Sequence, residues 1–229
     1  MKIGVIGANG FIGREIYDHL PESDRHMIFR ESWKDIHYDV IIDANGSSMK
    51  YLAQTNPIGD FDASVNSVMH YVNHLKYDKY IYLSSIDAAT ARLSNYGFNR
   101  SIAEQVVTKY ADNWTIIRLC SVIGPEAQKG IVYDILNDNK LFVTKASFIQ
   151  IIPAHTVAVK IKEAFHGEDY KTLAFYSNGG IGVNKICHMF GKDPDVDDAA
   201  ETQYYNEAAG VGFLTPEEYL KEAFYERVV

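Results

Sequence analysis

The segment Gly7-Ala8-Asn9-Gly10-Phe11-Ile12-Gly13 decides the fold. It follows an apolar run at 2–7 that is typical of a buried strand, and it leads into residues 11–20, whose apolar side chains recur at helical spacing. The first glycine allows a tight turn, the second lets a pyrophosphate approach the backbone, and the third lets the helix pack on the strand. Since a helix N-terminus offers unpaired N–H groups to an anion, we expect a nucleotide-binding turn rather than a purely structural one. The candidate contacts are Gly7, Asn9, Gly10, Phe11, Ile12 and Gly13.

Strands and helices alternate along the first two thirds of the chain, as they do in βαβ units. Further strands are expected at 27–30, 39–43, 80–83 and 114–119, and helices at 60–75 and 96–110. About eight residues separate the second and third strands, fewer than a helical crossover needs, so one crossover is shortened. The pattern predicts an α/β fold with a Rossmann-like doubly wound parallel sheet.

The alternation loosens after Pro125. Helices are expected near 131–137, 156–165 and 183–190, with a strand near 173–176. Thr215, Pro216 and Glu218 form a capping-box sequence for a last helix. We therefore expect a dinucleotide-binding core at 1–125 and a small C-terminal substrate lobe at 126–229, integrated with the core, to which residues 155–177 return.

Composition excludes several classes of protein. The 229 residues are 47% apolar and 23% charged, which fits a globular protein and not a disordered or fibrous chain. The 30 acidic and 22 basic residues give a net charge of −8, which is unfavourable for binding a phosphate backbone, so no nucleic-acid partner is expected. No run approaches the length of a membrane span, and no signal peptide is recognisable, so no membrane association is expected.

The cysteines and histidines give no metal pattern. Cys120 and Cys187 lie in apolar stretches without ligand spacing, as expected for buried free thiols of a reducing compartment, by default the cytoplasm. His70 and His74 form one H-x-x-x-H pair without a third ligand nearby in sequence. The sequence therefore predicts no metal.

The glycine spacing, with Phe11 and Ile12 before the third glycine, resembles the extended branch of the short-chain dehydrogenase/reductase superfamily, which comprises nucleotide-sugar epimerases, dehydratases and reductases. Segment 43–46 resembles the small-residue stretch along the adenosine side of the cofactor, which implies contacts from Ala44, Asn45 and Gly46. Segment 118–125 resembles the strand and turn beside the nicotinamide. The resemblance covers residues 1–160 well and the remainder loosely.

The same resemblance implies a set of active-site residues. Segment 64–67 is similar to the helix that carries an active-site asparagine, here Asn66. Segment 80–85 is similar to the strand that ends in two hydroxyl residues, which implies Ser85 in catalysis and Ser84 in packing or cofactor contact. Segment 96–100 is similar to the Tyr-x-x-x-Lys motif, which implies Tyr96 and Arg100 in both catalysis and cofactor binding.

These residue types suit hydride transfer at a carbon that bears oxygen. A tyrosine is a poor base at neutral pH, but a cation one helical turn away favours phenolate, and Tyr96 and Arg100 are four residues apart. Ser85 at a strand end could hydrogen-bond the substrate oxygen. The alternatives are a packing role for Tyr96, a cap role for Ser85 and a solvated surface position for Asn66.

The sequence departs from the resembled pattern in two places. Arginine stands at position 100 where the family has lysine, and the two side chains differ in geometry and in proton transfer. Ser85 and Tyr96 are only eleven residues apart, a shorter interval than is usual in the family. His155 stands where the resemblance would place an acidic residue, and it receives no role.

Cofactor type depends on the end of the second strand, where an acidic residue suits NAD and a basic residue suits NADP. Arg30 lies there with Glu31 after it, so the sequence favours NADP over NAD. The resemblance implies an NAD(P)-dependent epimerase, dehydratase or reductase acting on a nucleotide sugar, and a homodimer formed through the helices at 60–75 and 96–110. Met69 and Tyr71 lie beyond one core-facing stripe of the first helix, which favours that dimer unless they pack inward. The alternative function is an NADP-binding sensor or scaffold without turnover, suggested by Arg100.

Overall fold

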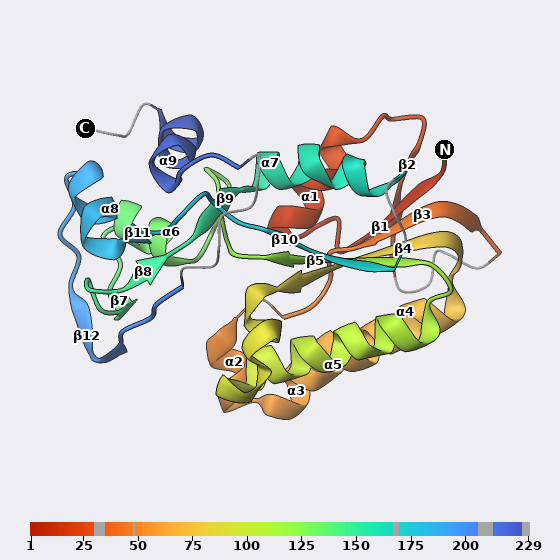
Figure 1. Ribbon diagram of the computed structural model, residues 1–229, viewed down its shortest axis with the longest axis horizontal. Coiled ribbons are helices and arrows are strands. Elements are labelled where there is room, and N and C mark those ends of the chain that lie inside the picture. The colour runs from red at the N-terminus through yellow and green to blue at the C-terminus, as the bar shows by residue number, and fades with distance from the viewer. Residues whose placement is uncertain (30–34, 48, 167–169, 206–212, 226–229) are drawn as a thin grey trace. The chain divides into compact units, whose positions relative to one another are not determined.

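Strand β1 (Ile3–Ile6) is buried at every residue and lies inside a six-stranded sheet in the computed structural model (Figure 1). The structure describes residues 1–29, 35–47, 49–166, 170–205 and 213–225. The strand order is β10-β5-β4-β3-β1-β2. The other strands are β2 (Arg25–Ile28), β3 (His37–Asp43), β4 (Lys76–Ser85), β5 (Trp114–Leu119) and β10 (Lys171–Phe175). The pairs β1 with β2, β1 with β3, β3 with β4 and β4 with β5 are all parallel, which confirms the expected α/β doubly wound class.

Within the part of the chain that the structure describes, β2 is the edge strand on the side where a Rossmann sheet of order 3-2-1-4-5-6 has one strand more. The sequence explains this, because β2 ends at Ile28 and β3 begins at His37, which leaves too little chain for a strand and a helix between them. Strand order reverses between β1 and β3. This switch point is where doubly wound sheets bind their ligands.

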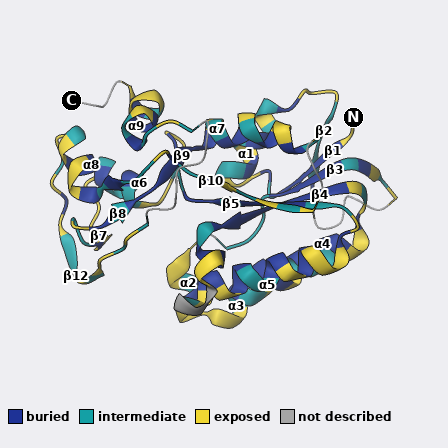
Figure 2. Ribbon diagram, in the orientation of Figure 1, coloured by how far each residue is buried: buried dark blue, intermediate teal, exposed yellow. Residues whose placement is uncertain are grey.

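Helices cover both faces of the sheet (Figure 1). Helices α1 (Phe11–His19) and α7 (Ala154–Lys160) lie on one face, while α4 (Ser67–His74) and α5 (Asn95–Tyr110) lie on the other. Residues of α4 and α5 pack with β1, β3, β4 and β5 in one apolar core, drawn in dark blue in Figure 2. Tyr71 is buried in this core and Met69 packs against it, so both side chains turn inward, and the sequence argument for a dimer that rested on them was wrong.

The helix expected at 60–75 is interrupted. It runs as α3 (Pro57–Phe61), a π-helical turn η1 (Asp62–Asn66) and then α4. The sequence did not predict α2 (Lys50–Thr55) or the 3₁₀ segment η2 (Ile86–Leu93), which fills the short interval before α5. A further 3₁₀ turn, η3 (Ile161–Ala164), follows α7.

The chain divides into two units by its internal contacts. The first unit holds residues 1–119 and 155–174, and the second holds residues 120–154 and 175–229, whereas the sequence predicted a boundary at 125. The second unit pairs β6 (Ser121–Ile123) with β9 (Ile151–Pro153), β7 (Leu141–Val143) with β12 (Val196–Glu201), and β8 (Phe148–Ile149) with β11 (Ile181–Gly182). Its helices are α6 (Ile131–Leu136), α8 (Val183–Met189) and α9 (Pro216–Phe224).

Two predictions made from the sequence of the second unit agree with its structure. Thr215 and Glu218 form the expected capping box at the start of α9, with the Glu218 carboxylate accepting from the Thr215 backbone at 2.8 Å. Cys120 and Cys187 are buried free thiols. Throughout the described residues, no helix combines the length and the apolar character that a membrane crossing requires.

Candidate active site

The glycine turn lies at the switch point of the sheet, where β1 and β3 end side by side with Ile6 opposite Asp43. Gly7 has a φ of +77°, a conformation that favours glycine. A Cβ on Gly13 would lie 2.2 Å from the Gly7 carbonyl oxygen, so only glycine lets α1 approach the strand this closely. The expected structural roles of the first and third glycines are therefore visible in the geometry.

The start of α1 is open to an anion. Gly10 is the N-cap residue, no side chain caps the helix, and its first turn carries no acidic residue. Asn9 and Gly10 are exposed, while Phe11 and Ile12 are half-buried. The turn thus presents backbone N–H groups at an exposed surface, and Gly10 carries no Cβ that would occupy the space in front of them. These features fit the pyrophosphate of a dinucleotide.

The segment after β3 packs directly against the glycine turn. Ala44 donates its N–H to the Ile6 carbonyl at 3.0 Å, and a Cβ on Gly7 would lie 2.9 Å from the Ala44 oxygen. The Asn45 amide donates to Ser67 Oγ at 2.6 Å, which ties this segment to α4. The two predicted cofactor segments therefore form one continuous edge of the first unit.

Asp43 supports this edge from beneath. Its carboxylate is completely buried and accepts from the Tyr80 hydroxyl at 2.5 Å and from the Asn45 backbone at 3.0 Å. Burial raises the pKa of Asp43 to about 6, although both hydrogen bonds and the charge of Arg100 oppose the rise. The carboxylate thus fixes the chain direction just before Ala44.

Tyr96 and Arg100 lie together in the first turns of α5. Both are buried, and the guanidinium carbon lies 5.3 Å from the centre of the Tyr96 ring, a cation–π contact. Ser94 caps the helix by accepting from the Gly97 N–H at 3.0 Å. The expectation from the four-residue spacing, that the two side chains face the same way, agrees with this geometry.

Arg100 also reaches the cofactor edge. A Cβ on Gly46, whose φ is +123°, would lie 2.8 Å from both terminal guanidinium nitrogens. Arg100 Nη1 donates to the Tyr82 hydroxyl at 3.0 Å, and Nη2 donates to the Ser47 carbonyl. Its Nε is buried and has no hydrogen-bond partner among the described residues.

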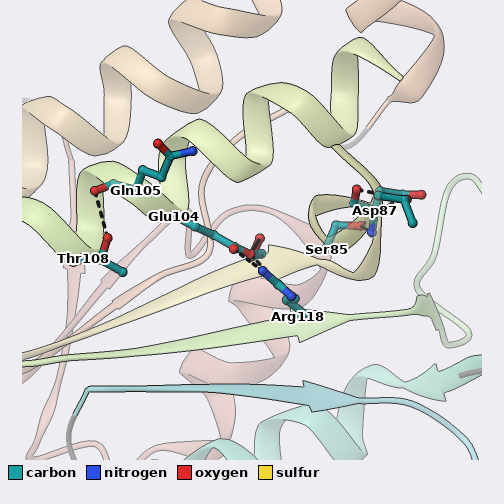
Figure 3. A network of polar contacts seen from close by, with 8 residues as sticks. Ser85, Asp87, Glu104, Gln105, Thr108 and Arg118 are labelled. Carbon is teal, nitrogen blue, oxygen red and sulfur yellow. Dashed lines mark hydrogen bonds and ion pairs between the residues drawn. The ribbon is translucent and has the colours of Figure 1, made fainter. Parts of the chain in front are cut away.

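Ser85 ends β4 and caps the segment that comes after it (Figure 3). Its hydroxyl donates to Asp87 Oδ2 at 3.0 Å and accepts from the Asp87 backbone N–H at 3.2 Å. Asp87 in turn pairs with Lys50 Nζ at 2.8 Å. The local geometry therefore agrees with a cap role for Ser85, which the sequence left open as an alternative to catalysis.

Ser84 joins a separate network under α5. It donates to Glu104 Oε1 at 2.6 Å, and the Glu104 carboxylate receives two hydrogen bonds from Arg118 at 2.9 and 2.6 Å (Figure 3). This charged pair raises the pKa of Arg118, mainly through the hydrogen bonding to Glu104. Of the two expected roles for Ser84, the hydroxyl thus serves packing against α5.

Asn66 lies in the π-helical turn with its side chain exposed, and its amide donates to Asp62 Oδ1 at 2.6 Å. The buried polar residues of this stretch are Asp60 and Ser64. Asp60 accepts from Asn99 of α5 at 2.7 Å. The exposed position of Asn66 agrees with the solvated surface position that the sequence left open as the alternative to the active-site role implied by the resemblance.

Two partners of Arg100 were not predicted from the sequence, Tyr82 and the Ser47 carbonyl. Tyr82 holds the guanidinium from β4, and burial raises its pKa to about 12, so this phenol is neutral. The available signal was the two-residue period of the strand, which turns Tyr80 and Tyr82 to the same face. Arg30 and Glu31, on which the NADP expectation depends, lie outside the described residues.

No protein-family model matches the chain, and no curated protein matches it significantly. Solved structures do match. The UDP-glucose 4-epimerase of Thermotoga maritima, solved with UDP-glucose, is 16% identical over 90% of both chains, with a TM-score of 0.73. The chain shares its fold with nucleotide-sugar enzymes.

Two further structures extend this likeness. The dTDP-4-dehydrorhamnose reductase of Bacillus anthracis, in complex with NADP, is 16% identical over 99% of both chains with a TM-score of 0.79. The UDP-N-acetylglucosamine 4-epimerase of Methanobrevibacter ruminantium, solved with UDP-N-acetylmuramic acid, is 14% identical over 99% of this chain and 96% of that one, with a TM-score of 0.77. The TM-scores show a common fold, and at such low identities the activity has to be argued from the site.

Proposed function

We propose that the protein is an NAD(P)-dependent epimerase, dehydratase or reductase acting on a nucleotide-linked sugar or a similar hydroxyl or carbonyl substrate. The observation that carries the proposal is the burial of Tyr96 and Arg100 together, with the guanidinium against Gly46 on the edge formed by the glycine turn. The fold is shared with epimerases and a reductase solved with nucleotide sugars or NADP, which supports the same class.

The chain's own residues have defined tasks in this proposal. The N–H groups at the start of α1 hold the pyrophosphate, and the segment Ala44, Asn45 and Gly46 borders the adenosine side. A nicotinamide dinucleotide, when bound, supplies the hydride chemistry. Tyr96 Oη gives or takes the proton of the substrate oxygen, while Arg100 fixes the ring and provides a permanent positive charge beside it.

Ser85 has a smaller part in this scheme than the resemblance implies. Its hydroxyl both donates to and accepts from Asp87, so the hydrogen bond to Asp87 Oδ2 must break before the hydroxyl can donate to a substrate oxygen. Asn66 is directed to solvent and serves the helix. We therefore assign the proton transfer to Tyr96 alone.

The second unit is the proposed substrate lobe. It contains a cavity of about 150 Å³ whose lining includes Ser121, Tyr133 and Asn137 as polar groups and Ile123, Val132 and Phe224 as apolar ones. Such a mixture suits part of a nucleotide sugar. NADP remains the preferred cofactor on the strength of Arg30, two positions beyond the end of β2, and cytoplasmic location remains an expectation from the buried free thiols.

A sensor or scaffold without turnover is the second candidate, and one observation favours it. Arg100 donates from one terminal nitrogen to the Tyr82 hydroxyl and from the other to the Ser47 carbonyl, which fixes the guanidinium in place, and an arginine does not release the proton that the lysine of the resembled motif can pass on. A sensor would still bind the dinucleotide at the glycine turn. It would give no product.

The experiment that separates the two candidates has two parts. Calorimetric titration of the purified protein with NADP(H) and NAD(H) should give binding of both, with tighter binding of NADP(H), and Arg30→Ala should remove the preference. Incubation with each cofactor and a panel of UDP- and dTDP-sugars should then give a changed sugar by mass and absorbance. Binding without any product would favour the sensor, and absence of binding would exclude both.

A further inference from the structure

The second half of α1 and the first turn of α7 bring together three potential metal ligands. Glu15 and His19 lie one turn apart on α1, and His155 is the second residue of α7. One ligand atom from each of the three side chains lies within 4.8 Å of the other two. All three residues belong to the first unit.

We propose that Glu15, His19 and His155 form a binding site for a divalent transition metal ion of the zinc class. Two imidazoles and one carboxylate are a common protein ligand set for such ions, with a fourth position left for water. Tetrahedral zinc with bonds of about 2.1 Å separates its ligand atoms by about 3.4 Å. Glu15 Oε1 lies 3.8 Å from His155 Nδ1, so modest side-chain rotation brings the set to bonding distance.

A backbone contact orients the ring of His19. Its Nδ1 lies 2.8 Å from the Glu15 backbone carbonyl. In the tautomer that carries its proton on Nδ1, the ring donates to this carbonyl and leaves Nε2 as the ligand atom. A backbone carbonyl that fixes the second nitrogen in this way is the usual outer contact of metal-binding histidines.

Ion pairing alone gives a weaker account of the cluster. The Glu15 carboxylate is 3.5 Å from His19 Nδ1 and 3.8 Å from His155 Nδ1, and all three side chains are partly exposed, where such pairs contribute little. The two imidazole rings meet edge to face with their centres 4.7 Å apart, so two charged rings would repel each other. A bound cation instead requires both rings to be neutral, which removes that repulsion.

The site is distant from the proposed chemistry. Glu15 and His19 lie four and eight residues beyond Phe11, about 6 and 12 Å along the helix at 1.5 Å per residue, so the metal would lie beside the second half of α1 and away from the pyrophosphate turn. His155 is also the residue at which the chain returns to the first unit. The metal therefore acts as a structural clip that fastens α7 to α1, and its ligands come from segments too far apart in the sequence for spacing to predict them.

The chelator-treated full-length protein is titrated with Zn²⁺ in competition with a chromophoric chelator, and with Co²⁺ while the visible spectrum is followed. We expect one ion per chain, a Co²⁺ spectrum of four-coordinate type, and a higher unfolding temperature with Zn²⁺. His155→Ala and Glu15→Gln should each weaken Zn²⁺ affinity at least about tenfold and abolish the thermal shift. Both side chains lie at the surface, so these variants should fold.

A second histidine pair on the same protein supplies the control. His70 and His74 of α4 stack with their ring centres 4.4 Å apart, and among the described residues no third ligand completes a metal cluster with them. The double variant His70→Ala/His74→Ala should keep the one-to-one Zn²⁺ binding and the thermal shift. Loss of binding in this control, unchanged binding in His155→Ala, or no binding of either ion at tens of micromolar protein would overturn the proposal.

Discussion

Asp43 is the residue at which the stability of the cofactor edge should depend on pH. Its pKa, about 6 in the folded state against 3.8 for the free group, is raised mainly by burial. The folded protein therefore holds the proton of Asp43 at a pH where the unfolded chain has released it. The contribution is fully present below about pH 4 and is lost as the pH rises through 6, and it amounts to about 3 kcal/mol.

Asp43→Asn should remove this dependence. The free energy of unfolding of the wild type, measured by urea denaturation, should contain a component that falls between pH 4 and pH 6.5, and the variant should lack it. Tyr80→Phe, which removes a hydrogen bond that lowers the Asp43 pKa, should shift the fall to higher pH. Identical pH profiles for wild type and Asp43→Asn would show that the carboxyl does not titrate in this range.

Arg100 combines a charge with two fixed hydrogen bonds, and two substitutions separate them. Arg100→Met leaves the Tyr82 hydroxyl and the Ser47 carbonyl without this partner and should destabilise the protein by about 1–3 kcal/mol while weakening dinucleotide binding. Arg100→Lys keeps the charge and should retain dinucleotide binding, and with it any activity. Thermal unfolding and calorimetry measure both effects, and equal behaviour of the two variants would contradict the role given to the charge.

At the scale of elements, two substitutions in the glycine turn should affect stability and cofactor binding differently. Gly13→Ala forces a Cβ to within 2.2 Å of a backbone oxygen and should cost about 1–3 kcal/mol of stability. Gly10→Ala places its Cβ 3.3 Å from the same Gly7 oxygen and should cost less stability than Gly13→Ala, while its methyl group obstructs the pyrophosphate. Unfolding curves and cofactor titrations of both variants test this, and tight cofactor binding by Gly10→Ala would argue against the anion site.

The elements with strong local signals were predicted from the sequence, and those that depend on tertiary packing were not. Strand β5 and helix α5 follow their apolar periods closely, and α9 begins at its capping box. No sequence pattern marks the π turn within the helix expected at 60–75. Asp60 and Ser64 are buried there, and their burial depends on how this helix packs beside α5. Segment η2 is an exception, because it was not predicted although its start carries a local signal, the Ser85 hydroxyl that accepts from the Asp87 N–H.

In the candidate site, too, the features fixed by local spacing were predictable and those that depend on packing were not. The pairing of Tyr96 with Arg100 was predictable because four-residue spacing on a helix fixes which side chains are neighbours. The partners of Ser84, Ser85 and Arg100 depend on which elements pack together, and one sequence does not specify that. Glu104 and Arg118, for example, meet only because α5 crosses β5.

At the scale of the whole molecule, we expect a homodimer formed through the helical face that contains α4 and α5. The support is now the exposure of Phe98 and Tyr110 on α5, which are 51% and 49% exposed. Light scattering at micromolar concentration should give the dimer mass, and Phe98→Asp should give the monomer. Phe142→Asp, at a position of the second unit that is 72% exposed, is the matched control and should leave the mass unchanged. A monomeric wild type would rule out the dimer.

The central claim for the whole molecule is that it is an enzyme with Tyr96 as its acid/base. The most direct test is the turnover of a nucleotide sugar by the wild type and by Tyr96→Phe, with cofactor affinity measured on the same preparations. We predict that the variant loses about two to four orders of magnitude in turnover while its cofactor affinity stays nearly the same. Turnover by Tyr96→Phe within a factor of a few of the wild type would contradict this claim.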